Sequence, residues 1–260
     1  MDRSFLSDQA VVKASRGFVC ARLATYEDKE EAVFLKSVFR GRTGELENSV
    51  FGIFDPTGKK RLVRTGRSPS FAFDDAAEMA SEMQKISKKY PGKKQVKVSA
   101  RQMPYLKNLR LALNVTASDA QQLLIVHAAD KKQLASMEAK LKQLIWKDKL
   151  VGRFLYVSVV GEGKDLLKGI TKALKKSGSF MVVKPGEFGL TGEVIDSVSA
   201  TAKVDKIEKQ LLVIAKKHKG LSKDSRQSIR KGRKSGAKWE TEVPVTDPHD
   251  GGRRRRSKNG

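Results

Sequence analysis

Residues 121–150, QQLLIVHAADKKQLASMEAKLKQLIWKDKL, place a short apolar run directly before a longer segment with helical periodicity. The apolar residues of QQLLIVHAAD are consecutive rather than alternating, which is typical of a strand buried on both faces. In the segment that follows, apolar residues recur every three to four positions and predict a helix. The side chains expected to point inward are Leu134, Met137, Leu141, Leu144 and Ile145. The stretch therefore predicts a strand and its covering helix, as in an α/β domain.

The residues downstream continue this alternation. Residues 152–160, GRFLYVSVV, predict a second strand, and residues 164–177, KDLLKGITKALKKS, predict a second helix. Residues 179–198, SFMVVKPGEFGLTGEVIDSV, place Pro and Gly between two apolar runs and predict a hairpin. Residues 204–219, VDKIEKQLLVIAKKHK, then return to helical periodicity. The predicted order is β-α-β-α-β-β-α.

The first part of the chain repeats a shorter version of this order. Residues 17–25, GFVCARLAT, predict a strand, and residues 28–39, DKEEAVFLKSVF, predict a helix that starts with a capping box. Residues 49–66 predict a hairpin around the turn sequence DPTG. Residues 73–90 begin acidic, end basic and carry an apolar stripe, as a helix does. We therefore expect each half to hold its strands in one sheet.

These patterns divide the chain into four parts. Residues 1–91 form an incomplete first domain, residues 92–107 a basic linker, residues 108–219 a complete second domain and residues 220–260 a basic tail. The tail has few apolar residues and many small polar ones, so it cannot offset the entropy of folding and is expected to be disordered. Deleting it should leave both domains folded.

The element order over residues 108–219 resembles the thioredoxin fold, and residues 1–91 resemble part of a second copy. Residues 18–23, FVCARL, are followed by an acidic helix start, and residues 55–58, DPTG, are similar to a hairpin turn of thioredoxin-like proteins. Residues 7–15, SDQAVVKAS, resemble the interior of the first helix, which leaves no room for a strand before it. The resemblance implies an α/β protein of two tandem thioredoxin-like domains, the first without its N-terminal strand.

The cysteine pair of active thioredoxins is missing from this chain. Their chemistry needs two cysteines at a helix N-terminus, where backbone amides and the helix dipole lower the thiol pKa. The corresponding loop here, residues 127–132, reads HAADKK and contains no sulfur. The proline that precedes the hairpin strand in the family is also missing from residues 178–183 and 47–54. Both departures indicate a thioredoxin-like protein that is redox-inactive.

Cys20 is the single cysteine of the chain and the one weak candidate for a catalytic residue. It lies within the strand predicted at residues 17–25, and its counterpart in the second half is Tyr156. Free cysteine commonly behaves as a small buried hydrophobe. We therefore expect Cys20 to be a core residue rather than a reactive thiol.

Other residues with chemical potential are scattered. The histidines, His127, His218 and His249, do not stand at metal-ligand spacing, so we expect no metal site. Residues 161–166, GEGKDL, lack the Gly and the Ser or Thr of a phosphate-binding loop. His127, at the end of the predicted central strand, is expected to be a hydrogen-bonded structural residue. No cofactor is expected.

The net charge of +24 is concentrated in the linker and the tail. Residues 92–107 carry five lysines and arginines without an acidic residue, and residues 220–260 carry twelve against five acidic residues. Such concentration favours a polyanionic partner, although it also fits a protein that is simply basic for solubility. The candidate polyanion-binding residues are Arg230, Lys231, Arg233, Lys234, Arg253, Arg254, Arg255 and Arg256. Both clusters are expected to be flexible and poorly selective.

Trp239 is the exception among the polar residues of the tail. An indole flanked by a lysine can stack on a nucleic-acid base or pack back onto the folded domain. No second aromatic residue alternates with the arginines, so we expect Trp239 to dock on the protein.

The function class that fits best is a non-catalytic thioredoxin-like binding or scaffold protein with a protein or acidic polymer as partner. Nucleic acid is a possible but non-specific ligand. The alternative is a thiol oxidoreductase or peroxidase-like enzyme that uses Cys20 or a motif upstream of this chain. No apolar run reaches the length of a membrane span, so a soluble protein is expected. Its location stays open, and a removed leader and an extracytoplasmic location are compatible with the sequence.

Overall fold

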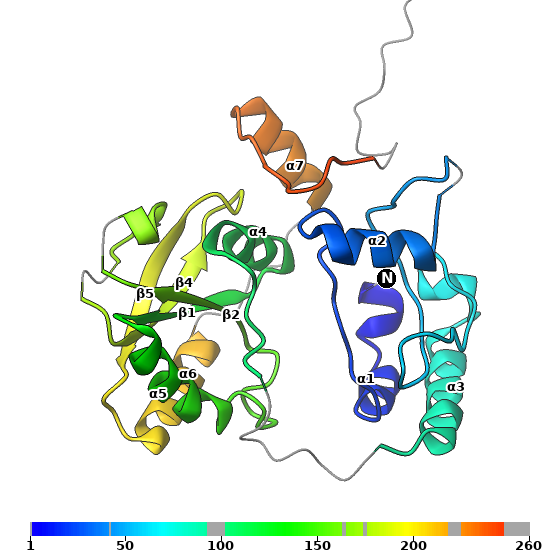
Figure 1. The fold of residues 1–260 in the computed structure, drawn as a ribbon, viewed down its shortest axis with the longest axis horizontal. Coiled ribbons are helices and arrows are strands. Elements are labelled where there is room, and N and C mark those ends of the chain that lie inside the picture. The colour runs from blue at the N-terminus through cyan, green and yellow to red at the C-terminus, as the bar shows by residue number, and fades with distance from the viewer. Residues whose placement is uncertain are drawn as a thin grey trace, which may run out of the picture. The chain divides into compact units, whose positions relative to one another are not determined.

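The computed structural model describes residues 2–41, 43–92, 102–162, 165–173, 176–217 and 225–246. The chain forms two compact units. Unit 1 comprises Met1–Gln95 and Glu240–Gly260, and unit 2 comprises Val96–Trp239. The fold is mixed α/β, and its sheet lies in unit 2 (Figure 1).

Unit 2 is built on a five-stranded sheet with the strand order β2-β1-β4-β5-β3. Strand β1 pairs in parallel with β2 and antiparallel with β4, β4 pairs antiparallel with β5, and β5 pairs in parallel with β3. The elements of this unit are α4 (Leu109–Asp119), β1 (Gln122–Ala128), α5 (Lys131–Lys142), β2 (Phe154–Val160), the 3-10 turn Asp165–Leu167, β3 (Ile170–Thr171), β4 (Ser179–Pro185), β5 (Gly192–Ser199), α6 (Val204–Lys217) and α7 (Ser225–Lys234).

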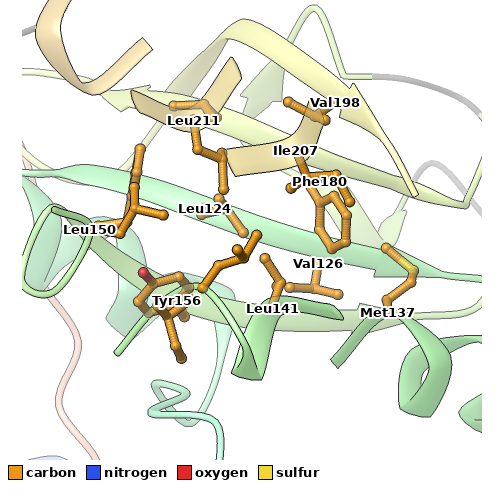
Figure 2. Packing of buried hydrophobic residues seen from close by; sticks show 14 of the residues in the cluster. Leu124, Val126, Met137, Leu141, Leu150, Tyr156, Phe180, Val198, Ile207 and Leu211 are labelled. Atoms are coloured by element: carbon orange, nitrogen blue, oxygen red, sulfur yellow. The ribbon is translucent and has the colours of Figure 1, made fainter. Parts of the chain in front are cut away.

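Strand β1 is the centre of this unit and is buried along its whole length. Successive side chains of a strand point to opposite faces, so β1 contributes to two apolar cores. One face packs against α5 and α6 (Figure 2), through Leu124, Val126, Met137, Leu141, Phe180, Ile207 and Leu211. The other packs against α4, through Leu123, Ile125, Ala112, Leu113, Val157, Met181 and Val183. Helices cover both faces of the sheet (Figure 1), which explains the continuous apolar run of β1.

The expected strands and closing helix of this half are confirmed, but the expected helix at residues 164–177 is wrong. Its described residues contain the 3-10 turn Asp165–Leu167 and the short strand β3. Gly169 has a φ of +87°, which no right-handed helix accommodates. The two residues after it pair with β5 instead. Helix α4, which the pattern analysis did not assign, occupies the face of the sheet opposite α5.

Unit 1 is held together by helices and loops. Helices α1 and α3 pack around an apolar cluster that includes Phe5, Val11, Phe73, Met79 and Met83. A second, smaller cluster joins α2 to a loop through Tyr26, Leu35 and Leu46. The elements of this unit are the π-helical turn Asp2–Leu6, α1 (Gln9–Ser15), α2 (Lys29–Val38), the 3-10 turn Pro69–Phe71 and α3 (Ala76–Lys89).

The sheet expected in the first half is not found in the described residues of unit 1. Residues 17–25, expected to be a strand, adopt neither strand nor helix. The expected hairpin turns as predicted at residues 55–58, where Gly58 has a φ of +71° and donates its N–H to the Asp55 carbonyl at 2.9 Å. Its arms are joined by the isolated bridges Phe51–Gly66 and Phe54–Arg61 rather than by a ladder. The described part of residues 1–91 therefore contains no complete thioredoxin-like sheet.

Residues 225–246 of the tail that was expected to be disordered have defined structure, and its other residues lie outside the described part of the chain. Within residues 225–246, α7 begins at Ser225 and the chain then folds back to place Trp239 against the β4–β5 turn. The Val243 N–H donates to the Tyr26 carbonyl at 2.9 Å, and the Thr246 hydroxyl donates to the Leu46 carbonyl at 3.0 Å. The last described residues therefore belong to unit 1, although the preceding ones belong to unit 2.

Candidate functional site

His127 occupies the end of β1 and is fully buried. Its backbone carbonyl accepts the Gly178 N–H at 2.8 Å, and its ring Nε2 lies 3.1 Å from the Gly161 carbonyl oxygen. Because a carbonyl oxygen only accepts, Nε2 must carry a proton and donate to it. The expected structural role of His127 agrees with this bond.

Ser179 lies directly opposite His127 in the β1–β4 pairing, so both side chains are on the same face of the sheet. Ser179 is also buried. Among the described residues, neither the Ser179 Oγ nor the His127 Nδ1 has a hydrogen-bond partner. Buried polar atoms are usually satisfied, so this pair marks a polar spot at the end of an apolar sheet.

Glu162 lies just beyond β2 at the same end of the sheet. The Ser177 hydroxyl donates to its carboxylate at 2.6 Å. This hydrogen bond, and more weakly the nearby His127 and Lys176, hold the pKa of Glu162 below its ordinary value. The loops that follow β2 and precede β4 are thus joined by a charge-assisted hydrogen bond.

The N-terminus of α5 is closed by the chain itself. The Asp130 carboxylate accepts the Gln133 N–H at 2.7 Å, and the Gln133 side-chain carbonyl accepts the Ala129 N–H at 2.7 Å. This is an N-cap in which the residue at the third helical position reaches back over the turn. The start of α5 is therefore capped by a carboxylate.

Cys20 is exposed, which corrects the expectation of a core residue. The neighbouring Val19 is 99% exposed, because the stretch lacks strand partners that would bury it. The Cys20 thiol lies 3.8 Å from the Ser15 carbonyl oxygen. Cys20 is thus open to reagents, in contrast to the buried His127 and Ser179 at the end of the sheet.

Helix α7 carries the basic residues at 230–234 in an ordered position. Its ten residues, SRQSIRKGRK, include five basic residues and no acidic one. The helix ends in a turn in which the Ala237 N–H donates to the Gly232 carbonyl at 2.8 Å and the Gly236 N–H to the Arg233 carbonyl at 3.3 Å. Gly236 has a φ of +78°, so these bonds form a Schellman motif. The motif reverses the chain toward the helix it has just left.

Trp239 docks on the protein, as expected. Its indole N–H donates to the Phe188 carbonyl at 2.9 Å, and its ring meets the Phe188 ring edge-on at a centroid distance of 6.4 Å. Gly232 of α7 is buried under the indole, and a Cβ at this position would collide with the ring. Lys231 adds an ion pair with Glu187 at 3.6 Å. These contacts attach α7 to the β4–β5 turn.

The structure brings together some of the residues that the sequence singled out. Arg230, Lys231, Arg233 and Lys234 are exposed on one helix. Residues 253–256, the second basic cluster, lie outside the described residues, as do His218 and His249. The sequence analysis did not find the His127–Ser179 pair, because sheet register decides which residues face each other and it cannot be read from composition.

No group of three or more His, Cys, Asp or Glu side chains is placed to hold a metal ion in the part of the chain that the structure describes. None of the described helices has the length and apolar character needed to cross a membrane. Comparison of the chain with protein-family models, with curated proteins and with solved structures gives no match.

Proposed function

We propose that the protein is a non-catalytic binding protein that recognises an acidic partner. The observation that carries the proposal is the ordered basic helix α7, attached to the β4–β5 turn through Trp239. A helix with five basic residues and no acidic residue attracts anions over a long range. Because α7 is anchored, its charges have a defined position, unlike those of a mobile tail.

A thioredoxin-like origin is proposed for unit 2 alone. The order β1, α5, β2, β4, β5, α6 supports it, and so do the parallel β1–β2 and antiparallel β1–β4 pairings. The helix expected between β2 and the hairpin is replaced by a turn and a short strand. The absence of sulfur from residues 127–132, together with the carboxylate cap of α5, supports a redox-inactive role.

The exposed Cys20 favours one alternative, an enzyme that uses a single thiol. A peroxidase-like reaction would oxidise this thiol to a sulfenic acid, which a second thiol must then reduce. The enzyme and the non-catalytic binding protein differ in the effect expected of Cys20→Ser on peroxide consumption. The alternative expects this variant to abolish thiol-dependent peroxide consumption, whereas the proposal expects the wild type to consume no more peroxide than the variant.

Retention on immobilised heparin, a sulfated polymer, tests the proposed binding. The variant R230Q/R233Q/K234Q removes three positive charges from α7. Its control, K206Q/K209Q/K216Q, removes three from exposed positions of α6 in the same unit. We expect the α7 variant to elute at clearly lower salt than both the wild type and the control. Equal elution of the two variants would show that only net charge matters and would contradict the proposal.

A further inference from the structure

We infer that the acidic partner is a nucleic acid, contacted through its phosphate backbone by the outward face of α7, and that Trp239 positions this face. The inference rests on the proposed function and names the class of partner.

The basic side chains lie on the side of α7 that faces away from its anchor. Gly232 is buried under Trp239 and marks the inner side. Successive residues of a helix are rotated by about 100°, so Arg230, Arg233 and Lys234 lie roughly 100° to 160° away from Gly232. The side chains of these three residues are exposed. Docking of the inner side therefore presents the cations outward as one stripe.

The exposed face lacks what a protein partner would need. Interfaces between proteins depend on a desolvated centre of aromatic and apolar residues. The aromatic residues that the described part of the chain places against α7, Trp239 and Phe188, pack on the helix and on each other. Ile229, 41% exposed, is the one apolar residue of the helix. Affinity at this face must come from charge, which favours a polymer with closely spaced anions over an acidic protein surface.

A nucleic acid has the charge density that matches this stripe. The three cations of the stripe lie within about 6 Å along the helix axis, and duplex DNA carries about one negative charge per 1.7 Å of its axis. The guanidinium group of Arg230 can form two parallel hydrogen bonds with a phosphate, and Arg233 and Lys234 add positive charge beside it. Contacts of this kind position the protein without reading bases, so binding should be largely independent of sequence.

The Gly232→Ala variant tests whether binding needs α7 docked on Trp239 or only needs α7 to be a basic helix. Alanine is the better helix former, so a role for α7 as a free basic helix predicts equal or tighter binding. A Cβ at this position collides with the indole, so a role for the docked helix predicts displacement of Trp239 and weaker binding. Trp239→Phe removes the hydrogen bond to the Phe188 carbonyl and part of the ring that packs on Gly232, so it should also weaken binding.

The test measures binding of the full chain to a 20-base-pair duplex and to poly-L-glutamate at equal anion concentration, at low salt. We expect the duplex to bind at least about tenfold more tightly, R230Q/R233Q/K234Q to lose about tenfold or more, and K206Q/K209Q/K216Q to lose much less. We also expect Gly232→Ala to weaken duplex binding and to increase quenching of tryptophan fluorescence by iodide.

The outcomes distinguish this inference from the proposed function. Equal affinity for poly-L-glutamate and duplex, with both lost in the α7 variant, would overturn the inference that the partner is a nucleic acid. The proposal that α7 binds an acidic partner would still stand. Loss of neither in the α7 variant would overturn both. Unchanged or tighter duplex binding by Gly232→Ala would overturn the positioning role of Trp239.

Discussion

Glu162 and Ser177 give the end of the sheet a residue-scale test. The Ser177 hydroxyl is the largest cause of the lowered pKa of Glu162. A carboxyl whose pKa is lower in the folded state stabilises the fold above its unfolded pKa, and this contribution is lost as the pH falls through the folded pKa. We expect Ser177→Ala to raise the Glu162 pKa toward its ordinary value, as measured by NMR titration of the carboxyl carbon. Ser37→Ala, which removes an exposed hydroxyl elsewhere, is the control, and equal Glu162 titration in all three proteins would refute the contact.

Cys20 provides a second residue-scale prediction. Because its side chain is exposed, a thiol reagent should label it about as fast in the native protein as after denaturation. Cys20→Ser should change the free energy of unfolding by no more than about 0.5 kcal/mol, as is usual for surface positions. Labelling that requires unfolding would place the thiol in a core and restore the strand expected there.

At the scale of elements, Gly189 sets the packing of the β4–β5 turn on α4. It has a φ of +68°, and a Cβ would lie 2.8 Å from the Asn114 Cα. Gly58 has a similar φ of +71°, but no atom within 4 Å of a Cβ. Gly58→Ala should therefore cost about 1 kcal/mol from backbone strain alone, and Gly189→Ala roughly 2–4 kcal/mol. Hydrogen exchange of amides in unit 1 and in unit 2 measures the loss of stability in each variant. Equal losses would contradict the close approach of Gly189 to α4.

The elements also show what sequence patterns can and cannot predict. Strand β1 was predictable because burial on both faces demands consecutive apolar residues. Residues 17–25 have a similar composition, but a strand needs partners, and pairing partners are a tertiary property. Residues 164–177 have helical spacing, but Gly169 adopts a left-handed φ and breaks it. Helix α7 was missed because Ile229 is its one apolar residue, so it has no apolar periodicity, and its apolar contacts come from Trp239 and Phe188 outside the helix.

At the scale of the whole chain, the C-terminal segment contributes to both units. Truncation after residue 219 was expected to leave the folded domains intact, but it removes Trp239 from unit 2 and Val243 and Thr246 from unit 1. The Tyr26 carbonyl would lose the Val243 N–H, and the Leu46 carbonyl would lose the Thr246 hydroxyl while keeping the Tyr26 hydroxyl. Val243 would also leave the apolar cluster around Tyr26 and Leu46. We therefore expect this truncation to speed hydrogen exchange around α2. Truncation after Thr246 is the control. Identical exchange in both truncated chains would contradict the role of Val243 and Thr246 in stabilising unit 1.

The most direct test of the central claim, binding of an acidic partner by the ordered basic face of α7, is the salt dependence of duplex affinity. Each phosphate contact lowers the slope of log affinity against log salt by about 0.9. Three contacts by Arg230, Arg233 and Lys234 predict that R230Q/R233Q/K234Q has a slope shallower than the wild type by about 2.7, while K206Q/K209Q/K216Q keeps the wild-type slope. A slope that is the same in the wild type and the α7 variant would show that α7 does not contact the polymer.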